Sequence, residues 1–172
     1  MNTANNKRRR ESIHLIESAF IDLLQTTPLT RITVSDLCKA TGLNRSTFYS
    51  NFLDIYDLAD KLRVKLEEDF SELFADYDTV HQTDGALKMF THIKENQIFY
   101  TTYFKLCREE EHLVRIYDEK QAEQYQLSSN LKYHIEFFRN GLNAIIRLWL
   151  KSGCQESPEE MAQILKEEYR GR

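Results

Sequence analysis

Proline and glycine are scarce in this chain, with two and five residues in 172, and their scarcity favours long helices over a turn-rich β fold. The three cysteines, Cys38, Cys107 and Cys154, are not spaced as close pairs, so we expect no disulfide framework. The sequence also lacks an uninterrupted run of about eighteen apolar residues, the length that a membrane-spanning helix needs. The opening segment MNTANNKRRRES has no apolar core of a signal peptide, and we therefore expect a cytoplasmic, all-α protein that makes no membrane contact.

Charge is distributed unevenly along the chain. Residues 1–52 contain seven Lys or Arg and four Asp or Glu, a net charge of +3, so the remaining 120 residues carry −7 and the total is −4. A negative total argues against a general nucleic-acid coat protein. A positive end on a negative body is instead what site-directed DNA binding needs.

The stretch TVSDLCKATGLNRSTFYSNF, residues 33–52, has the pattern of two short helices joined by a tight turn. Thr33 and Asp36 are spaced as a capping box, which predicts a helix start. Gly42 ends that helix because glycine adopts left-handed backbone angles without penalty, and Asn44 can cap the next helix. Such a pair forms a helix-turn-helix, whose second helix lies in a DNA major groove. The apolar stripe of the first helix is Val34, Leu37, Cys38 and Ala40.

The second helix of this motif separates apolar from polar residues. Phe48 and Phe52, four residues apart, are expected to pack inward. The other side chains suit DNA, because Arg can donate two hydrogen bonds to guanine, Asn can pair with adenine, and hydroxyls can bind phosphate oxygens. On spacing alone, an ordinary helical hairpin inside an all-α domain is the alternative. The polar residues are Arg45, Ser46, Thr47, Tyr49, Ser50 and Asn51.

The segment RITVSDLCKATGLNRSTFYSNF resembles the DNA-binding domain of the TetR family of bacterial regulators. One position departs from the family pattern, because Ile55 stands where many members have a phosphate-binding Lys. Lys61 or the arginines near the start of the chain are alternatives for that contact. The resemblance implies base-reading roles for Arg45, Ser46, Thr47 and Asn51, and contacts to the DNA backbone by Thr33, Tyr49 and Ser50.

Apolar residues at spacings of three and four predict helices on both sides of the motif. A first helix is expected from Lys7 to before Pro28, after disordered residues 1–6. Its basic cluster, Lys7–Arg10, either aids solubility or contacts DNA, and we favour the contact. A long helix over residues 54–77 is expected to join a DNA-binding domain, residues 7–53, to a C-terminal domain, residues 84–170. Helices of that domain are expected at about 85–95, 97–107, 111–127, 130–152 and 158–169.

The C-terminal domain is rich in aromatic side chains. The resemblance makes a cavity for a small apolar or aromatic effector plausible in this domain, although for any one of these aromatic residues a place in the core is favoured. The candidate lining residues are Phe90, Tyr100, Tyr103, Phe104, Tyr117 and Phe137.

The last fifty residues contain a helix with two adjoining apolar stripes. One stripe can face the domain's own core and the other a second copy of the chain. In TetR-like proteins two C-terminal helices from each subunit build the dimer interface, and a homodimer suits a two-fold symmetric DNA site. The second stripe is Phe137, Gly141, Ala144 and Leu148. The expected dimer seam is Leu131, Ile135, Phe138, Leu142, Ile145 and Trp149, with Met161 and Leu165 from the final helix.

Three classes of function are compared against these patterns. We expect a regulator, most simply a repressor, that binds a palindromic double-stranded DNA operator as a homodimer and leaves it when an effector binds. A coactivator of the same fold, which pairs with a metabolic enzyme, is the alternative. An enzyme is the weakest candidate, because no motif announces a nucleophile and its base. No cofactor is expected, and a metal site formed by His81, His92, Cys107 and His112 is disfavoured because Cys107 and His112 would not share a helix face.

Overall fold

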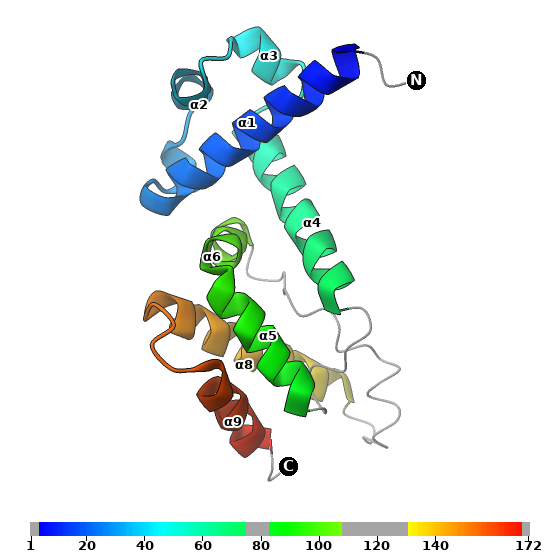
Figure 1. The fold of residues 1–172 in the computed structure, drawn as a ribbon, viewed down its shortest axis with the longest axis vertical. Helices are drawn as coiled ribbons and strands as arrows, with labels where there is room; N and C mark the ends of the chain where they lie inside the picture. The colour runs from blue at the N-terminus through cyan, green and yellow to red at the C-terminus, as the bar shows by residue number, and fades with distance from the viewer. Residues whose placement is uncertain (1–3, 75–82, 108–130, 170–172) are drawn as a thin grey trace. The chain divides into compact units, whose positions relative to one another are not determined.

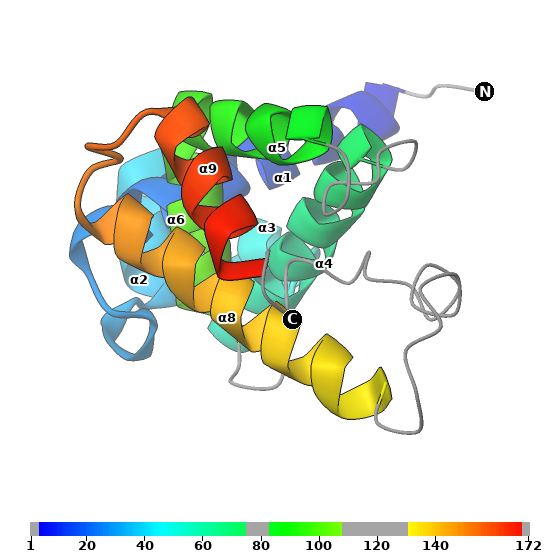
Figure 2. The same ribbon diagram turned by 90° about the horizontal axis from the view of Figure 1, so that it is seen from below.

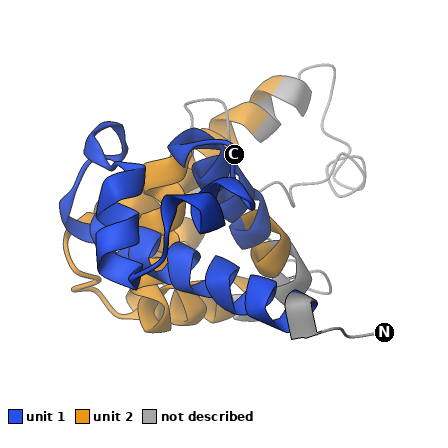
Figure 3. Cartoon of the chain, turned by 90° about the horizontal axis from the view of Figure 1, so that it is seen from above, with its two compact units in different colours: residues 1–66 blue, residues 67–172 orange. Residues whose placement is uncertain are grey.

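The computed structural model describes residues 4–74, 83–107 and 131–169, and every regular element in these ranges is a helix (Figure 1). The expected all-α fold is confirmed, and the helix expected at 111–127 lies outside the described residues. Two units divide the chain between Leu66 and Glu67 (Figure 3). The division falls inside helix α4, Ile55–Phe74.

The first unit begins with helix α1, Ala4–Thr26. This helix ends before Pro28, as expected, but it starts three residues earlier than Lys7. Residues 4–6 are therefore helical where disorder was expected, because Ala-Asn-Asn contains no residue that breaks a helix. The rest of the unit consists of the 3₁₀ turn η1, Leu29–Arg31, helix α2, Val34–Thr41, helix α3, Arg45–Tyr49, and the first part of α4.

A single apolar core holds the helices of this unit together. Phe20 of α1, Leu37 of α2 and Phe48 of α3 are each at most 1 % exposed, and Leu58 of α4 has no exposed surface. Removing one such side chain from water stabilises the fold by about 1.5–3 kcal/mol. An ion pair between Lys65 Nζ and Glu17 Oε2, at 2.8 Å, joins α4 to α1 at the edge of the core.

The second unit contains helices α5, Thr83–Glu95, α6, Gln97–Leu106, α8, Leu131–Lys151, and α9, Pro158–Tyr169. Helix α9 packs along α5, and α6 packs against α8 (Figure 2). The largest buried side chains of the unit are Phe70, Phe90, Tyr100, Tyr103 and Trp149.

The turn between α8 and α9 is fixed by both side-chain and backbone contacts. Gly153 adopts a left-handed φ of 77° at the end of α8. Trp149 Nε1 and Lys94 Nζ both donate to the carbonyl oxygen of Glu156, at 3.3 and 3.0 Å, so this oxygen connects α8, α5 and the turn. A capping box starts α9, in which the Ser157 N–H donates to Glu160 Oε2 at 2.7 Å and the Glu160 N–H donates to Ser157 Oγ at 3.1 Å.

Candidate nucleic-acid interface

The start of α2 is a capping box, as the sequence predicts. Thr33 Oγ1 accepts from the Asp36 backbone N–H at 3.3 Å, and the Thr33 backbone N–H donates to Asp36 Oδ2 at 3.1 Å. The Thr33 hydroxyl also donates to Asp36 Oδ2 at 2.6 Å, and these bonds hold the pKa of the Asp36 carboxyl below its usual value. Because its hydroxyl hydrogen is already donated, Thr33 could donate it to a DNA phosphate only by giving up Asp36.

The turn between α2 and α3 depends on Gly42. Its φ of 70° lies in the left-handed region, and its N–H donates to the Cys38 carbonyl at 3.0 Å, which closes α2 as expected. Asn44 occupies the N-cap position of α3 with extended angles, but its side chain makes no capping hydrogen bond. The glycine, together with the extended Asn44 backbone, therefore sets the direction of α3.

Helix α3 has one buried and one exposed face. Phe48 and Phe52 are 1 % and 4 % exposed, with ring centroids 5.5 Å apart, as their spacing predicts. Tyr49 is 55 % exposed and meets the edge of Phe48. The helix carries no acidic residue. Among the DNA-contact residues expected from the sequence, Thr33, Arg45, Ser46, Tyr49 and Ser50 are exposed, and Thr47 and Asn51 are half-buried.

Asn51 differs from the other candidates because both ends of its side-chain amide are bonded within the protein. Its Oδ1 accepts from Arg9 Nε of α1 at 2.9 Å, and its Nδ2 donates to the Thr47 carbonyl at 2.8 Å. Ser50 Oγ donates to the same carbonyl at 2.9 Å and keeps its acceptor lone pairs. The bond between Arg9 and Asn51 thus connects α1 to the end of α3.

Lys61, an alternative for the family's phosphate-binding Lys, is engaged beside Asn51. Its Nζ donates to Asp57 Oδ2 at 2.8 Å and to the Asn51 carbonyl at 3.2 Å, and it lies 5.3 Å from the centre of the Phe52 ring. The bond from Lys61 lowers the pKa of the Asp57 carboxyl. Ile55, at the position of the family's Lys, is buried.

The apolar stripe of α8 that was expected to form the dimer seam is largely buried within the chain. Phe138, Leu142 and Trp149 of the expected dimer seam are at most 3 % exposed, and Met161 and Leu165 of α9 are each 4 % exposed, so these residues form the chain's own core. Ile145 is half-buried, and the side chains of Leu131 and Ile135 lie outside the described part of the structure.

The neighbouring stripe of α8 is the one that faces outward. Phe137 is 60 % exposed and Leu148 is 70 % exposed, with Ala144 also exposed between them. Tyr133 on α8, 66 % exposed, and Ile164 on α9, 40 % exposed, add to the uncovered apolar surface. Phe137, Ala144 and Leu148 form the outward-facing stripe of α8.

A family model described as "Transcriptional regulator C-terminal region", one of the TetR family, matches residues 81–169, more than half of the chain. The chain belongs to the TetR family. The family resemblance first seen in residues 31–52 is therefore confirmed by the other end of the molecule.

A curated relative and a solved structure that are similar to this TetR-family chain both carry the name DhaS. The first is the HTH-type dhaKLM operon transcriptional activator DhaS of Lactococcus lactis subsp. lactis (strain IL1403), which is 32 % identical over 113 residues. That alignment covers 65 % of this chain and 59 % of the relative. The second is a solved structure of a dihydroxyacetone kinase operon activator DhaS, with a TM-score of 0.55 and 25 % identity over 91 % of this chain and 92 % of that one.

The aromatic residues expected to line an effector cavity are mostly core. Phe90, Tyr100 and Tyr103 are each fully buried. Phe90 packs edge-on against Trp149 at 5.5 Å. Phe104 is half-buried with Arg147 4.9 Å from its ring centre, Phe137 is exposed, and Tyr117 lies outside the described residues.

Two buried tyrosines of the second unit form hydrogen bonds with ionisable side chains. His92 Nδ1 and the Tyr100 hydroxyl are 2.6 Å apart, and Tyr103 donates to Glu67 Oε1 at 3.2 Å. Burial raises the pKa of both tyrosines and lowers the pKa of His92. Both tyrosines therefore stay protonated near neutral pH and serve as hydrogen-bonded core.

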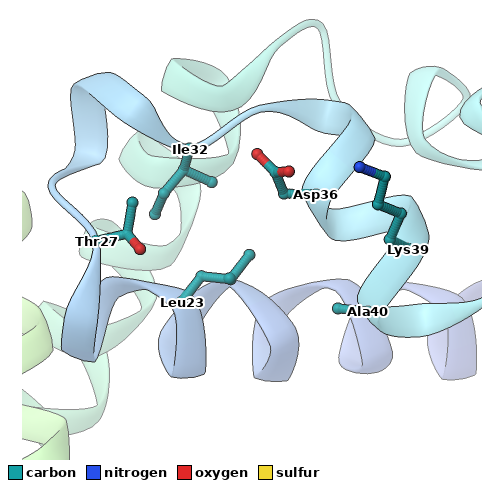
Figure 4. A pocket seen from close by; sticks show the side chains of 6 residues that line it. All are labelled: Leu23, Thr27, Ile32, Asp36, Lys39 and Ala40. Carbon is teal, nitrogen blue, oxygen red and sulfur yellow. The ribbon is translucent and has the colours of Figure 1, made fainter.

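A surface hollow of about 540 Å³ lies in the DNA-binding unit between the end of α1 and α2 (Figure 4). Ala40, expected to face inward, is exposed at the edge of this hollow. Asp36 lines it as well, but its carboxylate is already bonded to Thr33. The lining residues are Leu23, Thr27, Ile32, Asp36, Lys39 and Ala40.

Neither a metal site nor a membrane helix is found in the described residues. Within these ranges, no three His, Cys, Asp or Glu side chains are grouped as ligands for an ion. His81 and His112, two of the four metal-ligand candidates, lie outside the described residues. The helices of residues 4–74, 83–107 and 131–169 include none with the length and apolar content to cross a bilayer.

Proposed function

We propose that this chain is a sequence-specific DNA-binding transcriptional regulator that acts as a homodimer and reads its site with α3. The observation that carries the proposal is the exposed face of α3, where Arg45, Ser46, Tyr49 and Ser50 project together on a helix without an acidic residue. Arginine and hydroxyl side chains supply the donors that base edges and phosphates accept. The buried Phe48 and Phe52 hold that face outward.

The dimer in this proposal forms through the outward-facing stripe of α8. Phe137 and Leu148 expose more than half of their surface, and Tyr133, one turn before Phe137 on α8, is 66 % exposed. Exposed apolar surface of this kind marks a contact surface in soluble proteins. Two copies related by a two-fold axis would present two α3 helices to half-sites that repeat one or more duplex turns apart.

We further propose that the regulator activates transcription. The sequence pattern alone favoured a repressor, but both relatives named above are operon activators, and this favours activation. An effector that binds among Phe90, Tyr100 and Tyr103 would have to separate these rings, because each is fully buried.

Selection of bound duplexes from random DNA by the purified protein tests this function. The expected result is one enriched sequence with two-fold symmetry, whose half-site centres lie about 10 bp or a multiple of 10 bp apart. If the folded protein enriches no sequence but captures a stable protein partner from cells, the coactivator alternative replaces the proposal. A reporter gene placed beside the selected site then shows whether the protein raises or lowers transcription. Increased transcription is expected, and decreased transcription would indicate a repressor.

A further inference from the structure

The N-terminal part of α1 is fastened to the end of α3 by Arg9 and Asn51. Arg9 Nε donates to Asn51 Oδ1 at 2.9 Å across 42 residues of sequence, and Asn51 Nδ2 donates to the Thr47 carbonyl at 2.8 Å. Figure 1 shows α3 lying beside this end of α1. The two bonds fix the orientation of the amide, because one requires the oxygen to face Arg9 and the other requires the nitrogen to face Thr47.

An asparagine held in this way is poorly suited to read a base. Pairing with adenine uses the amide oxygen and the amide nitrogen together. In Asn51 both atoms already bond within the protein, so the amide keeps one N–H and one lone pair and cannot turn towards a base without losing these bonds. Asn51 instead fixes the position of Arg9, which lies on α1.

Arg9 keeps most of its donors after this bond is made. A guanidinium has five N–H groups in a planar fork, and donation by Nε leaves the four on the two Nη atoms. Arg9 is exposed, and this Nη fork matches the oxygens of a phosphate. Holding Nε in place also lowers the entropy that the side chain loses when it binds a phosphate.

The start of α4, the other place near the end of α3 for a phosphate, is occupied by carboxylates. Asp57 N donates to Asp54 Oδ1 at 2.8 Å, and Leu53 N donates to Asp57 Oδ2 at 2.9 Å. These backbone N–H groups are used, and two negative charges would repel a phosphate. Lys61 is paired with one of them at 2.8 Å.

We propose that Arg9 binds a DNA phosphate beside α3 through its Nη groups, and that Asn51 is the residue that positions Arg9 and not a base reader. This inference rests on the proposed DNA-binding function. It replaces the base-reading role that the family resemblance implied for Asn51, and it assigns one arginine of the basic cluster to the phosphate contact that Ile55 cannot make.

Salt-dependent binding to the selected site tests the inference, with Arg9→Ala, Asn51→Ala, the double variant and Arg8→Ala compared with the wild type. Arg8 is the matched control, since it has the same charge, is exposed and is one residue away. Arg9→Ala is expected to weaken binding about tenfold and to reduce the slope of log K against log salt by about one for each copy bound, with base preference unchanged. Arg8→Ala is expected to change the slope by less than half as much.

The Asn51 variants separate positioning from reading. If Asn51 acts through Arg9, Asn51→Ala weakens binding by a smaller factor, leaves the preferred sequence unchanged, and adds nothing in the Arg9→Ala background. A loss of preference at one base pair in Asn51→Ala, or equal effects of Arg9→Ala and Arg8→Ala, would overturn the inference while wild-type DNA binding stands. If the wild type binds no selected site, the proposed function fails and this inference fails with it. Thermal unfolding shows whether each variant is folded.

Discussion

Phe48 and Tyr49 are consecutive residues of α3 whose rings meet edge to face, with centroids 5.4 Å apart and planes at 89°. Phe48 is 1 % exposed and Tyr49 is 55 % exposed. The boundary between the protein's core and the exposed face of α3 therefore lies between two neighbouring rings. A helix of five residues has too few backbone hydrogen bonds to be stable by itself. The burial of its phenylalanine therefore stabilises it.

Truncation of these two rings is expected to separate stability from binding. Phe48→Ala should lower the free energy of unfolding by about 3–5 kcal/mol, since it removes a fully buried aromatic side chain. Tyr49→Ala should lower it by less than about 1.5 kcal/mol, because it loses mainly the edge contact with Phe48. Denaturant unfolding of both variants measures the difference. Equal losses would contradict the two-faced helix.

Removal of the capping hydroxyl at the start of α2 is expected to give a pH-dependent loss of stability. Thr33→Ala should cost about 1 kcal/mol near neutral pH. The hydrogen bonds from Thr33 lower the pKa of Asp36 in the folded state, so this stabilisation is complete above the ordinary value of 3.8 and is lost as the pH falls through the lower folded pKa.

Unfolding by denaturant at neutral pH and at about pH 3 measures the difference between Thr33→Ala and the wild type. The difference should shrink at the lower pH. Thr33→Ser keeps the hydroxyl and serves as the control, which should follow the wild type at both pH values. A difference that stays constant with pH would show that Asp36 does not depend on Thr33.

Two glycines are expected to respond oppositely to alanine. A Cβ at either Gly42 or Gly141 would meet no neighbouring atom of the same chain within 4 Å, so in a single chain backbone conformation decides the outcome. Gly42→Ala should destabilise by about 1–2 kcal/mol because its φ is 70°. Gly141→Ala, inside α8, should stabilise by about 0.5–1 kcal/mol through helix propensity. Chemical unfolding at one protein concentration measures both, and a neutral Gly42→Ala would argue against the left-handed turn.

A charge on the outward-facing stripe of α8 is expected to separate the proposed dimer without unfolding the chain. Leu148→Glu should shift the protein towards monomer in sedimentation experiments, because an unpaired carboxylate in an apolar contact loses its hydration. Ile98→Glu on α6, where the native side chain is 62 % exposed, is the matched control and should leave the assembly unchanged. A Leu148→Glu protein that sediments like the wild type would place the contact elsewhere.

The sequence was most reliable where a structural rule acts within a few residues. The capping boxes at Thr33 and Ser157, the left-handed Gly42 and the buried pair Phe48 and Phe52 all follow from spacings of two to four residues. These features depend only on neighbouring residues and not on the rest of the fold, so the structure agrees with the sequence at these positions.

Features that depend on distant parts of the chain were missed or misassigned. The two stripes of α8 are both apolar at helical spacing, and only packing against distant helices, such as α6, can decide that Leu142 is buried and Leu148 is exposed. No local pattern relates Arg9 to Asn51 across 42 residues. The aromatic content suggested a cavity lined by Tyr100 and its neighbours, but these rings pack against one another.

The affinity of Arg45→Ala for the DNA sequence selected by the wild type tests the central claim most directly. The account predicts a loss of about 1–3 kcal/mol in binding free energy and a relaxed preference at one base pair in each half-site, with the free energy of unfolding unchanged. Arg31→Ala, which removes the same charge from the exposed turn η1, should keep the sequence preference. An Arg45→Ala protein that binds the selected sequence as tightly and as selectively as the wild type would contradict the assignment of α3 as the DNA-reading helix.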